Sequence, residues 1–198
     1  FCNPRMLVHR NTDSLPAFRN AVVTIGTFDG VHLGHQQIIR QLKSEALENG
    51  GETVIITFHP HPRKIVPGKR EGIALLNTME EKISLLDSHG VDHIVIVPFT
   101  AEFSTLTAQQ YVTEFLVEKF HPSLLIIGYD HRFGQGRGGN YELLEHMAPA
   151  HGFEVREIPE HILNTVTISS TRIRNDLKNG NLAEANQFLG YPYLLSGT

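Results

Sequence analysis

The sequence predicts an α/β fold built on a doubly wound parallel sheet. Short runs rich in β-branched residues alternate with longer amphipathic segments along the chain. The later runs are short and strongly apolar, as expected for parallel strands covered by helices on both faces. The chain has 198 residues, 40% of them hydrophobic, which is enough for the core of one α/β domain. We therefore predict a single domain over residues 1–198, with its core at about 20–190.

Five segments have the length and composition of buried strands. In chain order they cover residues 21–26, 53–58, 92–98, 124–128 and 153–158. In a parallel sheet, the segments that follow these strands emerge at one edge, where open α/β sheets bind their ligands. A long loop with several prolines follows the second strand, and such loops are often functional in compact domains.

Helices are predicted between the strands and after the last one. The first has a broad apolar face and ends at the Gly50-Gly51 pair. Thr78 with Glu81, and Thr107 with Gln110, have the spacing of capping boxes at two further helix starts. The predicted helices lie at residues 32–49, from 78, from 107, at 141–151 with a disturbance at Pro149, at 170–179 and at 182–189.

Composition argues against several classes of partner and location. The formal net charge is −4, and the lysines and arginines form no basic stripe, so nucleic acid is a weak hypothesis. Cys2 is the single cysteine, which allows neither an internal disulfide nor a cysteine pair for zinc and suits a reducing, cytoplasmic setting. No apolar run reaches the roughly 20 residues of a membrane span. We expect no membrane or nucleic-acid partner.

The glycine-rich string GTFDGVHLGH follows the first predicted strand. Gly26 closes the strand, Gly30 permits a tight turn, and Gly34 removes a side chain where another backbone or a ligand comes close. His32 and His35 are three residues apart at a helix start, so they project from the same side of its first turn. With the helix dipole, they suit an anion such as a triphosphate. The alternative is a plain strand-to-helix turn capped by histidines.

The string resembles the signature of the nucleotidyltransferase superfamily that carries the H-x-G-H motif. More narrowly, it resembles the form found in bacterial FAD synthetases, the bifunctional riboflavin kinase/FMN adenylyltransferases. Residues 57–62 (TFHPHP), 127–134 (IGYDHRFG) and 168–174 (ISSTRIR) are similar to that family's T-F-x-P-x-P, G-x-D-x-R-F-G and I-S-S-T-x-I-R segments. The resemblance runs over roughly residues 20–195, with the segments in the right order, and implies a Rossmann-like fold.

The resemblance also implies roles for individual residues. Catalytic roles are implied for His32, His35 and Arg172. ATP contacts are implied for Gly26, Thr27, Phe28, Asp29, Gly34, Ser169, Ser170 and Thr171, the last two with Arg172 holding the β- and γ-phosphates. FMN contacts are implied for His59, Pro60, His61, Pro62, Asp130, Arg132 and Phe133. Mg²⁺ is expected to accompany ATP with few protein ligands, and no metal-binding residue is assigned.

The implied reaction joins FMN to the AMP part of ATP. An FMN phosphate oxygen attacks the α-phosphorus in line, and pyrophosphate leaves. The nucleophile is already an anion, so catalysis needs positioning and charge neutralisation rather than a general base. The family's riboflavin kinase module is absent and would begin near residue 195, so we expect the full-length protein to carry it as a covalent C-terminal partner.

Two residues depart from the family pattern, and several keep structural alternatives. His59 and His131 stand where Asp and Phe are more usual. The spacing of His59 and His61 resembles a metal pair, but zinc is disfavoured because no third ligand is placed. Asp29 is as well explained by a loop brace as by a ligand contact, and Asp130 has the same alternative.

Similar alternatives apply to the segment at residues 168–174 and to Phe133. The serines and Thr171 also suit a helix N-cap. Arg174 should face away from Arg172 and is better explained as a surface or salt-bridged residue. Phe133 also suits the core.

Two other functions are weighed against FMN adenylyl transfer. One keeps nucleotidyl transfer but changes the acceptor, to phosphopantetheine or nicotinamide mononucleotide, or transfers a cytidylyl group. The other is a non-catalytic flavin- or nucleotide-binding module, which the intact histidine pair disfavours.

Overall fold

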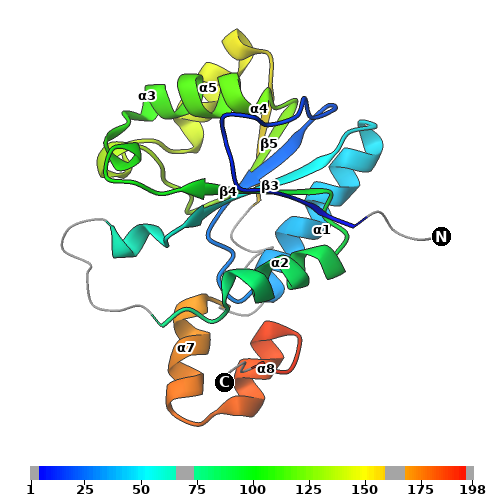
Figure 1. The fold of residues 1–198 in the computed structure, drawn as a ribbon, viewed down its shortest axis with the longest axis vertical. Coiled ribbons are helices and arrows are strands. Elements are labelled where there is room, and N and C mark those ends of the chain that lie inside the picture. Colours follow the sequence, from blue (N-terminus) through cyan, green and yellow to red (C-terminus); the bar gives the residue numbers. More distant parts are fainter. Residues whose placement is uncertain (1–4, 66–73, 159–167, 195–198) are drawn as a thin grey trace.

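The computed structural model describes residues 5–65, 74–158 and 168–194. Six strands form one sheet in the order β1-β4-β3-β2-β5-β6, and every neighbouring pair is parallel (Figure 1). The strands are β1 (Leu7–His9), β2 (Val22–Ile25), β3 (Thr53–His59), β4 (His93–Pro98), β5 (Leu124–Gly128) and β6 (Glu154–Ile158). The predicted α/β fold with a parallel sheet is therefore confirmed.

Successive residues of the central strands point to opposite faces, and each face is covered by its own apolar cluster. Val23 and Ile25 of β2 pack on one face, while Val22 packs on the other. Strand residues such as Ile55 and Ile126 are fully buried. Burial of both faces explains why these strands are almost continuously apolar.

Helices cover both faces of the sheet. On one face, α1 (Leu33–Glu48) and α2 (Met79–Ser88) pack through residues such as Leu42 and Leu86. The other face is covered by α3 (Ala108–Gln110), the π-helical η3 (Tyr111–Val117), α4 (Glu118–Phe120) and α5 (Tyr141–His151) (Figure 1). The sheet is therefore doubly wound.

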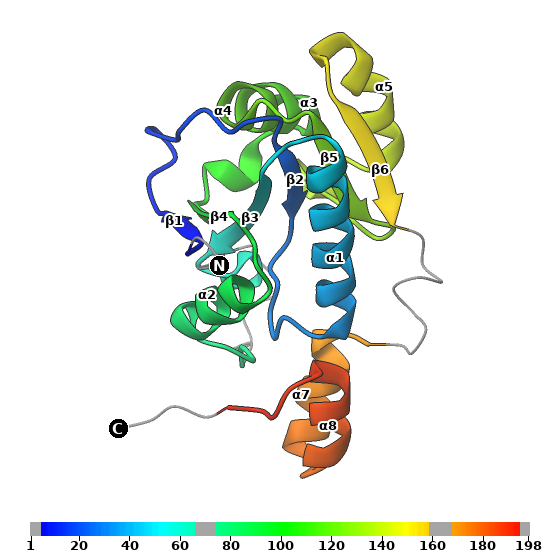
Figure 2. The same cartoon turned by 90° about the vertical axis from the view of Figure 1, so that its right-hand side faces the viewer.

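A helical pair lies beyond the carboxyl ends of the strands. It consists of α7 (Ser170–Lys178) and α8 (Leu182–Leu189), which pack on each other beside the start of α1 (Figure 2). Their small core contains Ile173, Phe188 and Leu76, the last from the segment before α2. This pair closes one side of the edge where the predicted motifs emerge.

Most element predictions agree with the structure to within two residues. Both capping boxes are present, Thr78 with Glu81 and Thr107 with Gln110. The expected disturbance at Pro149 is wrong, since α5 continues to His151 with this proline in its last turn. The edge strand β1 was not predicted, because three half-exposed residues give no alternating pattern. No helix within the described residues is both long and apolar enough to cross a membrane.

Candidate active site

The predicted motifs meet at the point where the strand order reverses. β2 lies between β3 and β5; the chain proceeds from β2 through β3 and β4 toward one side, and β5 and β6 lie on the other. Gly26 and His59 lie at the carboxyl ends of β2 and β3, and Gly128 ends β5. In doubly wound sheets this reversal opens the crevice in which ligands bind.

The turn between β2 and α1 is tightly constrained. Gly30 has φ +86°, and two non-glycine residues, Phe28 (φ +46°) and Val31 (φ +34°), also adopt left-handed conformations. The Gly30 amide donates to Asn77 Oδ1 at 2.6 Å, and the Tyr191 hydroxyl donates to the Gly30 carbonyl at 2.6 Å. Such conformations persist only where the surroundings enforce them, and they are frequent at functional sites.

The two motif histidines stack on each other at the start of α1. Their ring centroids lie 3.7 Å apart with an 18° interplanar angle. His32 is the N-cap residue, and its Nδ1 accepts from the His35 amide at 3.4 Å. A Cβ at Gly34 would lie 3.2 Å from the His32 ring, so a side chain at this position would crowd the imidazole.

Both imidazoles are neutral in the ligand-free protein. Burial lowers the pKa of His32 to about 4, with Arg174 adding to the effect. Burial lowers the pKa of His35 well below its ordinary value, with contributions from His32 and Lys82. His35 Nδ1 is buried without a hydrogen-bond partner, although the residue keeps part of its surface exposed. The pair therefore presents polar N–H groups rather than fixed positive charge.

Asp29 braces the motif turn. Its Oδ1 accepts from the Leu76 amide at 2.8 Å, and its Oδ2 accepts from Arg174 at 2.6 Å. The Asp29 residue is 2% exposed, and its burial raises the pKa of the carboxyl, although Leu76, Arg174 and Lys82 oppose the shift. Both carboxylate oxygens are thus occupied by protein groups, as the loop-brace interpretation predicted.

The Ser-Ser-Thr segment starts α7 and ties it to the same turn. Ser169 is the N-cap residue, its Oγ accepting from the Arg172 amide at 3.2 Å. The Ser170 hydroxyl donates to the Asp29 carbonyl at 2.9 Å, and Thr171 Oγ1 accepts from Arg174 at 3.3 Å. The segment therefore combines helix capping with a position beside the histidine motif.

Comparison with known proteins agrees with this arrangement. The FAD synthetase family model matches residues 15–172, which is most of the chain and includes the histidine motif. The chain belongs to the FAD synthetase family.

The chain is also similar to individual relatives and to a solved structure. It is 38% identical over 179 residues to a bifunctional riboflavin kinase/FMN adenylyltransferase of Listeria monocytogenes serovar 1/2a, covering 90% of this chain and 56% of the relative. A protein of the same name from Escherichia coli K12 is 35% identical over 176 residues, covering 89% and 56%. The chain thus spans little more than half the length of these relatives. A crystal structure described as a macrolide-efflux protein from Streptococcus pneumoniae has a TM-score of 0.81 at 26% identity, covering 98% of this chain and 64% of that one.

The two arginines of α7 lie in different surroundings, and the catalytic role predicted for Arg172 stays a prediction. The guanidinium of Arg172 lies 4.4 Å from the centroid of the Phe188 ring and 4.0 Å from Asp176, and its side chain is 49% exposed. Arg174 is 15% exposed and bonds to Asp29 in the motif turn. Arg174 is salt-bridged, as expected, and it is the arginine that contacts the turn of the histidine motif. The arginine that closes the I-S-S-T-x-I-R pattern is this residue, and the pattern itself was the signal that could have found it.

The proline-containing loop after β3 lies close to the histidine motif. His61 is half-buried, and its Nδ1 accepts from the Arg63 amide at 3.2 Å. Burial lowers the pKa of His61 to about 4, with contributions from Lys82, Arg63, Arg174 and Lys64. Charged residues of α2 and α7 thus act electrostatically on this loop. Pro60 is partly buried, His59 is exposed, and Pro62 starts the short helix η1 (Pro62–Lys64).

The segment after β5 splits between surface and core. Asp130 and Arg132 are exposed, whereas Phe133 is 5% exposed and its ring centroid lies 5.0 Å from that of Tyr111. The core interpretation of Phe133 therefore holds. His131 stacks on Phe133 at 5.9 Å, and its Nε2 is buried without a hydrogen-bond partner. Burial lowers the pKa of His131 to about 4.

Lys82 lies close to the histidine motif and was not among the site residues predicted from the sequence. It lies on α2 with 6% exposure, and its Nζ donates to the Thr27 carbonyl at 2.6 Å. Lys82 and Leu86 are four residues apart and form the buried side of α2. A lysine on the apolar face of an amphipathic helix was the available signal.

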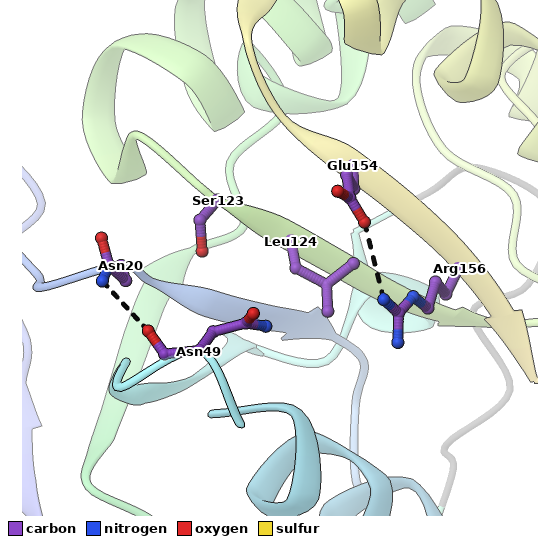
Figure 3. A pocket seen from close by; sticks show the side chains of 6 residues that line it. All are labelled: Asn20, Asn49, Ser123, Leu124, Glu154 and Arg156. Atoms are coloured by element: carbon purple, nitrogen blue, oxygen red, sulfur yellow. Dashed lines mark hydrogen bonds and ion pairs between the residues drawn. The ribbon is translucent and has the colours of Figure 1, made fainter. Parts of the chain in front are cut away.

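A pocket lies at the opposite edge of the sheet. It is about 260 Å³ and is lined by residues such as Asn20 before β2, Leu124 at the start of β5 and Arg156 within β6 (Figure 3). Asn20 donates to the Asn49 carbonyl at 3.1 Å, and Arg156 pairs with Glu154 at 3.6 Å. None of the predicted substrate-binding residues lines it, so it does not bear on the family's chemistry.

Proposed function

We propose that this chain transfers AMP from ATP to FMN, giving FAD and pyrophosphate. An FMN phosphate oxygen forms the bond to the α-phosphorus as the bond to the β-phosphate breaks, so pyrophosphate carries the displaced electron pair. The observation that carries the proposal is the stacked His32–His35 pair at the sheet's reversal point, with Arg174 beside it. Membership of the FAD synthetase family supports the same chemistry.

In this proposal the histidines donate hydrogen bonds to the triphosphate, and Arg174 supplies positive charge. Neutral His32 has its Nδ1 engaged as an acceptor, which leaves its Nε2–H as a hydrogen-bond donor. His35 lies directly against it and supplies a second imidazole for the α-phosphate and the leaving group. The positive charge that offsets the growing charge on pyrophosphate then comes from Arg174.

We therefore assign the β- and γ-phosphates to Ser170, Thr171 and Arg174 rather than to Arg172. Arg174 already reaches the motif turn, whereas the Arg172 guanidinium packs on Phe188. Binding of the phosphates need not break the Asp29–Arg174 bond, because a guanidinium has five N–H donors.

The acceptor is assigned to the loops after β3 and β5. His61 shares the electrostatic environment of the histidine motif, which favours a phosphate-bearing substrate nearby. The unpartnered Nε2 of His131 offers one hydrogen bond to a polar edge of the flavin. Asp130 and Arg132 are exposed beside it and can contact the acceptor.

Mg²⁺ is proposed to enter with ATP. Within the described ranges, no group of three or more His, Cys, Asp or Glu side chains could hold a metal ion. We propose that the ion is held mainly by phosphate oxygens and water. Bound there, it would neutralise phosphate charge. We also propose a cytoplasmic setting, and a covalently linked riboflavin kinase module in the full-length protein.

An acceptor panel tests the proposed substrate. FMN, phosphopantetheine and nicotinamide mononucleotide are incubated separately with ATP and Mg²⁺, and with CTP in place of ATP, and the products are identified by mass spectrometry. We expect FAD from FMN and ATP, with the other combinations slower by about a hundredfold or more. Faster adenylylation of another acceptor would overturn the assignment to FMN, and nucleotide binding without turnover would indicate a binding module.

A further inference from the structure

Lys82 joins three elements at the start of the histidine motif. Its Nζ donates from α2 to the Thr27 carbonyl at 2.6 Å, and the Thr57 hydroxyl of β3 reaches the same carbonyl at 3.3 Å. Thr27 immediately precedes Phe28, whose ring centroid lies 5.0 Å from that of His35. The ammonium therefore holds the backbone at Thr27, next to the Phe28 ring that contacts His35.

Among the described residues, no carboxylate forms a close ion pair with Lys82. Its nearest electrostatic counterpart is Asp29, whose oxygens bond to the Leu76 amide and Arg174. Burying an ammonium costs free energy unless the charge is paired and hydrogen-bonded. Its retention here points to a role toward the surrounding site.

The positive charge of Lys82 lowers the pKa of two imidazoles, those of His35 and His61. His35 faces His32 from its own helix and Lys82 from α2, beside the Phe28 ring. Burial and these neighbours lower the pKa of His35.

The second imidazole lies on the next loop. His61 faces Lys82 from α2 and Arg174 from α7, together with Arg63 and Lys64 from its own segment. After burial, Lys82 has the largest effect on the pKa of His61. Lys82 thus acts on one imidazole at the start of α1 and on another in the loop after β3.

We propose that Lys82 is a positioning residue for adenylyl transfer: its buried ammonium fixes the Thr27 carbonyl, and with it the Phe28 ring beside His35, and places a positive charge near the His35 and His61 imidazoles. The proposal rests on the proposed function above. Burial is the main reason that both imidazoles are neutral, and the charge of Lys82 adds to that effect. Loss of the charge would let both rings protonate more readily.

The test compares Lys82→Met, which removes charge and donor, with Lys82→Arg, which retains both. Histidine titrations are followed by NMR on ligand-free protein, and kcat for FAD formation is measured from pH 4 to 8.5. In Lys82→Met, we expect the pKa of His35 and of His61 to rise by at least about half a unit. We also expect kcat to fall about tenfold or more, with the acid limb of the profile moved to higher pH, and Lys82→Arg to restore both.

Lys43→Met provides a matched control. Lys43 also donates to a backbone carbonyl, that of His89 at 2.8 Å, but it is exposed and lies outside the site. Its loss should leave kcat and the titrations of His35 and His61 unchanged. A purely structural role for Lys82 would lower kcat without moving the acid limb or the titrations.

The two arms separate this inference from the proposed function. Unchanged titrations in Lys82→Met, or changed titrations with unchanged kcat, would overturn the inference. If the wild-type chain forms no FAD, the proposed function fails, and the titrations still decide whether the charge of Lys82 lowers the pKa of both imidazoles. Should Lys82→Met not fold, titration of wild-type His61 near 6.5 instead of about 4 would itself contradict the inference.

Discussion

Asp29→Asn tests whether the motif turn is held by a buried ion pair. The carboxylate side chain is 3% exposed, and its Arg174 partner is 15% exposed at 2.6 Å. Removing one partner of a buried pair costs about 3–5 kcal/mol, because the other charge is left without compensation. Asparagine keeps one acceptor for the Leu76 amide, and Arg174 retains some water, so we expect the lower end, about 3 kcal/mol. For a chain of this size, that lowers Tm by about 6–12 °C.

The assay is urea unfolding followed by circular dichroism, with m-values compared to confirm that the same transition is measured. Asp13→Asn is the matched control, because Asp13 also pairs with a cation, Lys119 at 3.2 Å, but its side chain is 85% exposed. An exposed pair contributes about 0–1 kcal/mol, so this variant should barely move the midpoint. Equal losses in the two variants would refute the idea that the turn depends on the buried pair.

Two further predictions concern charge in the site. Arg174→Ala should lower kcat/KM for ATP by about a hundredfold, whereas Arg172→Ala should lower it less than about threefold; steady-state kinetics decides, and the reverse order would return the phosphate role to Arg172. Burial lowers the pKa of His32, His61 and His131 to about 4, while the unfolded chain protonates near 6.5, so the unfolded state binds more protons between these values. The stability gained by burying these histidines in the neutral form is therefore complete above about pH 6.5 and is lost as pH falls toward 4. The urea midpoint should be lower at pH 5.5 than at pH 7, and an equal or higher midpoint at pH 5.5 would contradict these shifts.

The sequence predicted the features that depend on local patterns. The five long strands follow from apolar runs, and the capping boxes at Thr78 and Thr107 follow from residue spacing. The meeting of the motifs at one edge follows from parallel topology alone. The three-residue β1 has no comparable signal, because its pairing with β4 is set by tertiary contact rather than by composition.

Side-chain direction was the main limit on predicting the site. Whether Arg172 or Arg174 meets the histidine turn depends on how α7 packs against α8, where the Phe188 ring holds Arg172. The role of Lys82 depends on the distance from α2 to the Thr27 carbonyl, which no local pattern encodes. At Gly34 the sequence predicted the close approach of a backbone or a ligand; the protein group that lies close is the His32 ring, and the ligand contact stays a prediction.

The most direct test of the account is product formation by the purified chain. It is incubated with FMN, ATP and Mg²⁺, and FAD and pyrophosphate are quantified by chromatography, with riboflavin as a parallel substrate and His35→Ala as a folded control. We predict FAD and pyrophosphate in equal amounts and no phosphorylation of riboflavin. In His35→Ala, kcat should fall by about a hundredfold or more, with little change in Tm. Absence of FAD from a folded protein that binds ATP, or an unchanged kcat in His35→Ala, would contradict the account.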